Sequence, residues 1–380
     1  MTLTMIIGID GNEANESQRV GIGEYAFELI KQFENFQFPI SNFQFIIYVK
    51  NKPINDLPKE RPGWKYRIVG PKKLWTQIGL PIDLFLHSPR SDVFFTPTHY
   101  APRFSPVPCA ISVMDLSFLH FPELFKQSDL FQLKNWTRYS VKKAKKIFTI
   151  SNASKGDIIK QYGVLEDKVV VTYPGIKFKI QNSKFKITMQ KSKVLQERFN
   201  IKKNYILFVG TLQPRKNIVR LIEAFSLLDK KDIDLVIVGK KGWLYEEILD
   251  APRKFNVEQS VKFLDFATDK ELAQLYKNAL FFVLPSLYEG FGLPVLEAMK
   301  YSCPVITSNV SSLPEAGGNA ALYVNPLDTQ DIKEKMALLL NNVKLRSELI
   351  EKGKIQVEKF SWEKTARLTL TVLEQIVEEK

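Results

Sequence analysis

Two glutamates separated by a glycine-bearing turn are the residues whose types and spacing most directly indicate chemistry. Glu289 follows the apolar run Leu280–Leu284, which is typical of a buried parallel strand, and Glu297 lies in a stretch with helical spacing. Because the first N–H groups of a helix are unpaired and face the positive end of its dipole, a diphosphate can bind there while the carboxylates accept from sugar hydroxyls. This predicts a sugar-nucleotide site, although a plain strand–turn–helix with solvated glutamates fits the same residues.

A second segment places two cations where a helix is expected to begin. Gly210 ends a buried strand, and Arg215 and Lys216 precede the helical spacing that starts at Ile218. Cations near the amino end of a helix are poorly matched to its dipole, so we expect an anion to compensate them. Surface charges on a turn are the alternative interpretation.

Both segments resemble signatures of the GT-B glycosyltransferases of family 4. The stretch from Glu289 to Glu297 resembles that family's glutamate pair with Gly-Phe-Gly inside it, and the eight residues from Gly210 resemble its second signature. The resemblance implies that Arg215 and Lys216 hold the diphosphate of a nucleotide sugar. It also implies that Glu289 contacts the donor sugar and that Glu297 contacts the ribose. The transfer would retain configuration by same-face attack, with positioning and electrostatics supplying most of the rate.

The remaining site residues are assigned by the same resemblance. The glycine turn at Gly21 and Gly23 lacks the third glycine of a dinucleotide fingerprint, but in the family a turn at this place approaches the diphosphate. Backbone N–H groups of residues 291–293 are assigned to the sugar. The predicted substrate-binding residues are Gly21, Gly23, Arg215, Lys216, Gly290, Phe291, Gly292, Leu293 and Glu297, and the predicted catalytic residues are Glu289 and Asp115.

One position departs from the family's pattern. The stretch from Ala110 to Glu123 resembles the family segment in which a histidine and an aspartate lie near the reacting sugar carbon. Here Met114 replaces the histidine, while Asp115 is retained. A thioether neither titrates nor hydrogen-bonds strongly, so the histidine's polar contact is absent. His99, which follows a predicted strand, is the candidate to compensate, and a structural histidine is the alternative.

Strand and helix signals alternate in two successive series, which predicts two α/β halves with open parallel sheets. Ligands bind outside the carboxyl ends of such strands, so facing halves are expected to hold two substrates in the cleft between them. The resemblance specifies the GT-B fold, with two Rossmann-like doubly wound domains. The predicted strands are Met5–Ile9, Phe43–Val49, Val93–Thr96, Cys109–Val113, Ile147–Ile150, Tyr205–Val209, Leu235–Val238, Val261–Leu264, Leu280–Leu284 and Val305–Thr307.

The predicted domain boundaries follow from these series. Residues 1–176 form an amino-terminal, acceptor-side domain, and residues 204–360 form a carboxyl-terminal domain that binds the nucleotide-sugar donor. Between them lies a basic segment, residues 177–203. The last helix, residues 361–380, is expected from the resemblance to cross back to the amino-terminal domain.

Composition narrows the classes of partner. The chain has 380 residues, 45% of them hydrophobic, which is more than one core usually holds. Much of the net charge of +13 lies in residues 177–203, where nine basic residues stand against one acidic residue. Because no recognition helix, zinc spacing or RNA-binding signature accompanies it, we expect no nucleic-acid partner. The segment is either a solvated insertion or a patch for anionic lipid headgroups.

The positions of the cysteines and of one aspartate pair indicate the cellular compartment of the protein and whether it binds a metal. Cys109 and Cys303 are too isolated for a disulfide framework or a metal site, which favours a reducing compartment. The amino terminus lacks the pattern of a signal peptide, so we expect a cytoplasmic protein, with a peripheral position at the inner face of the membrane as a variant. The Asp-x-Asp triplet at residues 232–234 enters a predicted strand at its amino end, so we expect no metal and no cofactor.

The predicted function is the retaining, metal-independent transfer of a hexose to a glycan or lipid-linked acceptor in polysaccharide or glycolipid synthesis. GDP-mannose is the favoured donor because details of the signatures resemble a branch of polysaccharide mannosyltransferases. The loop expected to contact the base, residues 265–269, does not identify that base. Two alternatives stay open: a catalytically silent scaffold that binds a nucleotide sugar, which Met114 allows, and an epimerase or phosphorylase on the same fold.

Overall fold

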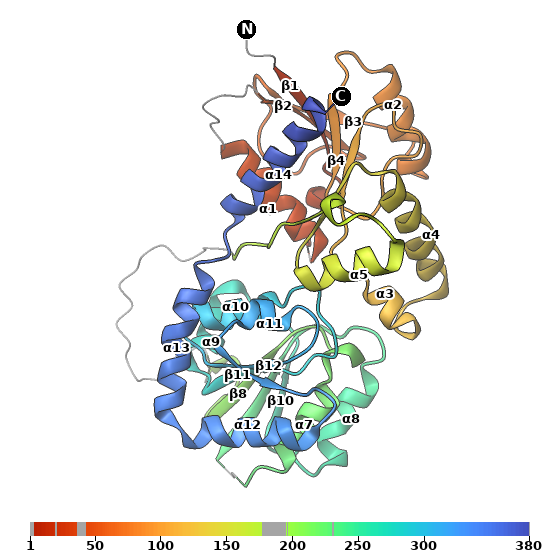
Figure 1. Cartoon of the computed structure of the whole chain (residues 1–380). Coiled ribbons are helices and arrows are strands. Elements are labelled where there is room, and N and C mark those ends of the chain that lie inside the picture. The colour runs from red at the N-terminus through yellow and green to blue at the C-terminus, as the bar shows by residue number, and fades with distance from the viewer. Residues whose placement is uncertain are drawn as a thin grey trace. The chain divides into compact units, whose positions relative to one another are not determined.

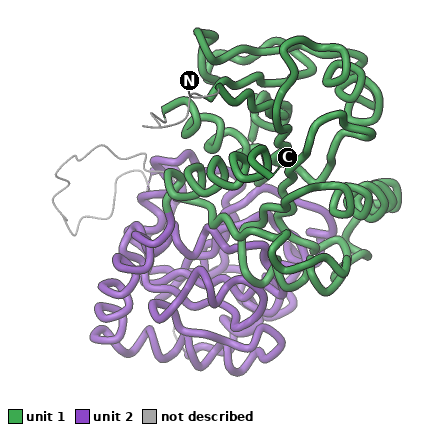
Figure 2. Tube along the Cα trace, turned by 45° about the horizontal axis from the view of Figure 1, so that its top comes forward, with its two compact units in different colours: residues 1–175, 361–380 green, residues 176–360 purple. Residues whose placement is uncertain are grey.

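The computed structural model describes residues 4–19, 21–35, 43–176, 195, 197–229 and 232–379 (Figure 1). The chain forms two compact units: unit 1 comprises residues 1–175 and 361–380, and unit 2 comprises residues 176–360 (Figure 2). Most of the predicted basic segment, residues 177–194 and 196, lies outside the described residues. Each unit is built on one parallel sheet, which confirms the two predicted α/β halves.

Unit 1 contains a seven-stranded sheet in the order β3-β2-β1-β4-β5-β6-β7, with neighbouring strands parallel. Its strands are β1 (Met5–Asp10), β2 (Phe43–Val49), β3 (Trp64–Ile68), β4 (Val93–Thr96), β5 (Cys109–Ser112), β6 (Lys146–Thr149) and β7 (Val169–Val171). Its helices are α1 (Ile22–Asn35), α2 (Leu80–Leu86), α3 (Ser117–His120), α4 (Gln127–Lys143), α5 (Asn152–Tyr162) and α14 (Trp362–Glu378).

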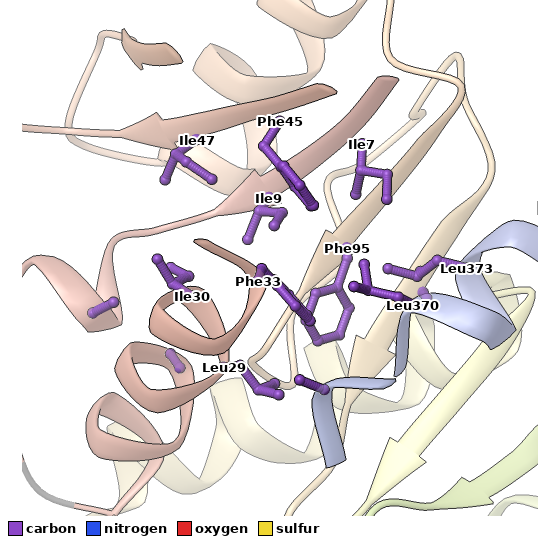
Figure 3. Close-up of a cluster of buried hydrophobic side chains, with 14 of the residues drawn as sticks. Ile7, Ile9, Leu29, Ile30, Phe33, Phe45, Ile47, Phe95, Leu370 and Leu373 are labelled. Carbon is purple, nitrogen blue, oxygen red and sulfur yellow. The ribbon is translucent and has the colours of Figure 1, made fainter. Parts of the chain in front are cut away.

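The main core of unit 1 lies between this sheet and the helices α1 and α14. Figure 3 shows side chains from β1 and β2 meeting those of α1 and of the distant α14, among them Ile9, Phe33 and Leu370. The rings of Tyr25 and Trp362 meet edge to face at 5.6 Å, so the last helix of the chain is part of this core. Burial of these apolar residues fixes the orientation of β1, whose carboxyl end carries a predicted site turn.

Unit 2 contains a six-stranded parallel sheet in the order β10-β9-β8-β11-β12-β13. Its strands are β8 (Asn204–Val209), β9 (Ile233–Val238), β10 (Val261–Leu264), β11 (Phe281–Leu284), β12 (Val305–Ser308) and β13 (Ala321–Val324). Its helices are α7 (Ile218–Ser226), α8 (Glu246–Lys254), α9 (Asp269–Asn278), α10 (Leu293–Lys300), α11 (Leu313–Gly317), α12 (Thr329–Asn341) and α13 (Val343–Val357).

Both sheets reverse their strand order at one point. In unit 1 the reversal lies between β1 and β4, and in unit 2 it lies between β8 and β11. At such a point the connections leave the sheet in opposite directions, so the loops at the carboxyl ends part and leave room for a ligand. Among the helices that the structure describes, none is long and apolar enough to cross a membrane.

Candidate functional site

The two predicted signatures of unit 2 lie on either side of its reversal point. The turn that carries Arg215 and Lys216 follows β8, and the turn that carries Glu289 follows β11, the neighbouring parallel strand. A backbone hydrogen bond of 2.9 Å from the Leu287 N–H to the Arg215 carbonyl joins the two turns directly. The fold therefore brings together residues more than seventy positions apart in the sequence.

The cation turn is held in place by an asparagine. Pro214–Lys216 form a short 3-10 turn, and Asn217, in a left-handed conformation at φ 60°, connects it to α7. The Asn217 side-chain amide donates to the carbonyl oxygens of Pro285, at 3.0 Å, and of Pro326, at 2.6 Å. Because Asn217 is buried, these bonds fix the turn relative to the end of β11.

Glu289 is the centre of a buried ion cluster. Its Oε1 lies 2.5 Å from the Lys216 Nζ and accepts from the Ser286 hydroxyl at 2.7 Å, and its Oε2 lies 3.1 Å from the Arg215 Nη1. The same Arg215 nitrogen donates to the Tyr288 carbonyl. Burial alone would raise the pKa of Glu289, but the charges of Lys216 and Arg215 outweigh it and lower the pKa to about 2. Glu289 is therefore an anion at neutral pH.

Two serines from the loop after β12 hold the backbone of Glu289. The Glu289 N–H donates to the Ser311 hydroxyl at 3.0 Å, and the Ser312 hydroxyl donates to the Glu289 carbonyl at 2.8 Å. With Ser286, these residues position the carboxylate, and no motif in the sequence predicts them. Serines in a loop carry no periodic signal, and only their place after the strand next to β11 distinguishes them.

The turn between Glu289 and α10 depends on Gly292. Gly292 has φ 98°, and a Cβ there would lie 2.7 Å from the Leu313 Cδ2, so a side chain would strain the backbone and displace Leu313. Leu293 begins α10 and is followed by Pro294, as predicted. Gly290 and Phe291 are buried in the turn, and the Phe291 ring packs edge to face on Phe360 at 5.2 Å. Phe291 is thus a core side chain, and only its backbone remains for the role assigned to it.

Glu297 lies on α10 and is half-buried. Its Oε2 accepts from the Tyr276 hydroxyl at 3.1 Å, and the Tyr276 ring stacks on Tyr301 at 5.8 Å. Tyr276 is fully buried, so it fixes one oxygen of the carboxylate. The hydrogen bond from Tyr276 therefore orients the Glu297 carboxylate before a polar ligand binds to it.

The glycine turn of unit 1 lies at the carboxyl end of β1, next to the reversal point. Gly21 has φ 51°, and its carbonyl accepts from the Tyr25 N–H at 3.0 Å as α1 begins. A Cβ at Gly23 would lie 2.9 Å from the Glu13 carbonyl oxygen. The same edge carries a buried carboxylate that the sequence analysis did not assign, Asp10, which accepts from the Asn12 amide and the Thr96 hydroxyl. Burial raises the pKa of Asp10.

Asp115 follows β5 in unit 1. Its Oδ1 accepts from the Ser117 N–H at 2.8 Å as α3 begins, and the carboxylate is partly exposed. Met114 packs against the main core of unit 1. The Nδ1 of His99 is buried without a hydrogen-bond partner among the described residues. Burial lowers the pKa of His99, and the charge of Asp115 opposes that shift.

The acidic triplet at residues 232–234 lies away from this edge. The strand begins at Ile233 rather than at Leu235, so Asp234 is a buried member of β9 near its amino end, and its Oδ2 lies 3.0 Å from the Lys262 Nζ. The loop expected to contact the base also ends one residue early. Thr268 caps α9 in a capping box with Glu271, and Asp269 is the first helical residue.

Comparison with known proteins identifies similar sequences and folds. Residues 190–356 match the family described as Glycosyl transferases group 1. The chain is 30% identical over 311 residues, 80% of its length, to O-antigen chain mannosyltransferase B of Escherichia coli, of which the match covers 78%. It is 33% identical over 235 residues to the serotype-specific mannosyltransferase WbdA of Escherichia coli, covering 60% of this chain and 28% of that protein.

Two solved structures share the architecture of the chain. Anabaena HepE, in complex with UDP and glucose, has a TM-score of 0.73 at 17% identity and covers 98% of this chain. WaaG, a glycosyltransferase involved in lipopolysaccharide biosynthesis, has a TM-score of 0.69 at 16% identity and covers 97% of this chain. The matches cover 100% and 99% of those chains, so the likeness spans both units and shows the GT-B fold.

Proposed function

Because this chain belongs to the glycosyl transferases group 1 family, we propose that it transfers mannose from GDP-mannose to a growing glycan or lipid-linked acceptor. The family makes it a glycosyltransferase. The choice of mannose, and of O-antigen-type polysaccharide as the product, is supported by the mannosyltransferases to which the chain is similar. We assign the donor to unit 2 and the acceptor to unit 1.

The ion cluster of Arg215, Lys216 and Glu289 carries this proposal. It lies at the carboxyl ends of β8 and β11, where the strand order reverses; both cations come from the turn that leads into α7, and Glu289 comes from the turn that precedes α10. A diphosphate entering there adds negative charge beside two cations that both pair with Glu289. The same cations stabilise the charge that develops on the departing nucleoside diphosphate, a task that a divalent metal performs in other transferases. We therefore propose a metal-independent transfer.

Glu289 has a binding and electrostatic role in this proposal. A carboxyl group with a pKa of about 2 holds no proton at neutral pH, so it cannot act as a general acid. As an anion it accepts hydrogen bonds from donor-sugar hydroxyls and stabilises positive charge that develops on the sugar. We propose a retaining transfer in which the leaving phosphate oxygen takes the acceptor proton and Asp115 lies near the reacting carbon.

The remaining contacts are assigned to the sugar and the nucleoside. Glu297 accepts from the ribose hydroxyls, with its orientation set by Tyr276. The backbone N–H groups of residues 291–293, at the start of α10, donate to the sugar. Gly21 and Gly23 are assigned to the diphosphate by the resemblance to the family.

Changing one cation tests the assignment of the diphosphate. Lys216→Ala or Arg215→Ala should weaken binding of GDP by about 1.5–3 kcal/mol, the scale of hydrogen bonds to charged groups, or roughly 10- to 150-fold in Kd. Titration calorimetry with GDP and UDP measures this, and Arg253→Ala, which removes an exposed cation from α8, serves as the control. If both variants bind GDP and UDP as tightly as the parent does, the diphosphate binds elsewhere.

A further inference from the structure

Unit 1 exposes a concentrated set of large apolar side chains. They belong to one short stretch of the chain, residues 68–86, and to a neighbouring loop. Leu86 is 74% exposed and Phe104 is 85% exposed. The set comprises Ile68, Leu74, Ile78, Ile82, Phe85, Leu86 and Phe104.

The helical stretch in the middle of this set is apolar on both faces. A π-helical turn (Trp75–Gly79) continues into α2 (Leu80–Leu86). Its inner side chains, Trp75, Leu80 and Leu84, are buried in a core with Tyr48 and Phe94 of the sheet. Its outer side chains at 78, 82 and 85 recur at helical spacing and are exposed. A helix with apolar side chains on two opposite faces is normally covered on both, and no described part of the chain covers the outer face of this one.

Two of the exposed side chains are held outward by unusual backbone. Leu74 has φ 54° and Phe104 has φ 51°, a left-handed conformation that bulky residues rarely adopt. The Arg103 N–H donates to the Thr76 carbonyl at 3.0 Å, which places the loop of Phe104 beside the start of the helical stretch. Such conformations persist only where the surrounding structure enforces them, and they concentrate at functional positions.

The rim of this face is cationic. Lys72 and Lys73 are exposed immediately before Leu74, and the Arg90 guanidinium lies 5.2 Å from the centre of the Phe85 ring. The one carboxylate within α2, Asp83, already pairs with Arg67 at 2.5 Å. An apolar centre with a positive border is therefore presented to whatever covers it.

We propose that this face binds the surface of an anionic lipid bilayer. We call it the α2 face and define it as the exposed side chains of Leu74, Ile78, Ile82, Phe85, Leu86 and Phe104 with their border of Lys72, Lys73 and Arg90. The apolar side chains enter the boundary between headgroups and acyl chains, and the cations meet anionic headgroups. A second copy of the chain fits less well, because a twofold contact would set each cationic border against its like.

This inference goes beyond the proposed reaction and does not require it. It places membrane contact on a described helix of unit 1 instead of on the basic segment at residues 177–203. A lipid-linked acceptor, if the chain uses one, would lie in the plane to which the α2 face binds. Vesicle binding and turnover are separate measurements, so failure of one does not decide the other.

Sedimentation of the full-length protein with vesicles tests the apolar part of the α2 face. Vesicles with one third phosphatidylglycerol in phosphatidylcholine should bind the parent, and I82S/F85S should lower the partition coefficient by roughly tenfold or more. L165S/L327S removes two more exposed apolar side chains elsewhere and should bind as the parent does. Unchanged melting temperatures for both variants show that folding is retained.

The cationic border has its own variant. K72Q/K73Q should lower partitioning on the anionic vesicles by about 25-fold, since each cation near such a surface contributes about fivefold. K344Q/K352Q removes the same charge from exposed positions of α13 and controls for the net charge of +13. If K72Q/K73Q and K344Q/K352Q lowered partitioning equally, the loss would come from the overall charge of the protein, and the proposal would be overturned.

A probe on α2 measures insertion directly. Ile82→Cys labelled with an environment-sensitive fluorophore should shift to the blue on anionic vesicles, whereas the same label at Leu165→Cys should not. Cys109 and Cys303 are buried, so the introduced thiol is the reactive one. Binding of I82S/F85S to anionic vesicles as tightly as the parent would refute the proposal. The proposal would also be refuted if vesicle binding were lost only in K184Q/K186Q, which alters the basic segment. A concentration-dependent dimer that I82S/F85S abolishes, without vesicle binding, would show instead that a second copy covers the face.

Discussion

The buried Glu289 carboxylate forms ion pairs with two cations, Lys216 and Arg215. The Glu289 carboxylate oxygens lie 2.5 Å from the Lys216 Nζ and 3.1 Å from the Arg215 Nη1, so the carboxylate holds both cations in position. A phosphate that binds them then meets groups already fixed in position, which reduces the entropy lost on binding. A bound phosphate also competes with Glu289 for these cations. The Glu289 carboxylate therefore opposes binding of the diphosphate, while it favours the donor sugar by accepting from its hydroxyls.

Replacing this carboxylate should therefore separate binding from catalysis. Glu289→Gln keeps the shape and removes the charge that opposes a phosphate, so GDP should bind at least as tightly as to the parent. Turnover should fall by about 100-fold or more, because the anion that faces the donor sugar is lost. Steady-state kinetics with calorimetry of GDP binding measures both. Parallel losses of affinity and turnover would instead show that Glu289 only supports the fold of the turn.

The pKa of Glu289 also predicts how stability depends on pH. Because the folded chain lowers this pKa from 4.5 to about 2, ionised Glu289 stabilises the fold by about 3 kcal/mol at any pH above its unfolded value. That contribution should disappear as the pH falls from about 5 to about 2. Denaturant unfolding of parent and Glu289→Gln should thus give free energies that differ at pH 7 and converge near pH 2. A constant difference across this range would contradict the ion cluster.

Met114 is where the chain departs from its family, and its surroundings predict a small effect of restoring histidine. The side chain packs against the apolar core of unit 1, so we expect an imidazole introduced there to lack the preorganised partners that a catalytic role requires. Met114→His should change turnover less than about threefold. An assay of nucleoside-diphosphate release compares the two proteins. A large gain in turnover for Met114→His would indicate that the parent protein is a catalytically silent scaffold. It would contradict the proposal that the parent protein is an active glycosyltransferase.

Central strands were predictable from the sequence because both of their faces are buried. The run Phe281–Leu284 is continuous apolar sequence, and the predicted strand there differs from β11 by one residue. The partly exposed edge strand β3, which reads Trp-Lys-Tyr-Arg-Ile, and the edge strand β13, whose two middle residues are half-buried, were not predicted, although the edge strand β10 was. The ion cluster was predicted as a set of ligand contacts but not as a set of mutual contacts. Two separate turns do not reveal in sequence that β8 and β11 are neighbours.

Adding a single methyl group at position 292 tests whether the turn before α10 requires glycine. Gly292→Ala puts a Cβ 2.7 Å from Leu313 at a φ of 98°, so it should destabilise the chain by more than about 1 kcal/mol and weaken binding of GDP-mannose. Gly156→Ala, in α5, is the control: its Cβ meets nothing within 4 Å, and alanine should stabilise that helix by up to about 1 kcal/mol. Thermal unfolding and calorimetry compare them. If Gly292→Ala behaves like Gly156→Ala, the turn does not depend on glycine.

The whole chain repeats one design twice. Each unit has a parallel sheet whose order reverses once, and each places predicted site residues at the carboxyl ends of the strands beside that reversal. The repetition was predictable from the alternation of strand and helix signals. Neither the apolar outer face of α2 nor the buried Asp10 was predicted, because each is recognised only when the packing of neighbouring elements is known. The α2 face accordingly gives unit 1 a function that no motif indicates.

Release of nucleoside diphosphate from GDP-mannose, UDP-glucose and UDP-N-acetylglucosamine, with a crude glycan or lipid-linked acceptor and with EDTA present, tests the central claim most directly. The parent protein should release GDP from GDP-mannose fastest, EDTA should leave the rate unchanged, and Lys216→Ala should lower it by at least about tenfold. A parent protein that binds these sugar nucleotides yet turns over none of them, or that acts only with an added divalent metal, would contradict transfer at the Arg215, Lys216 and Glu289 cluster.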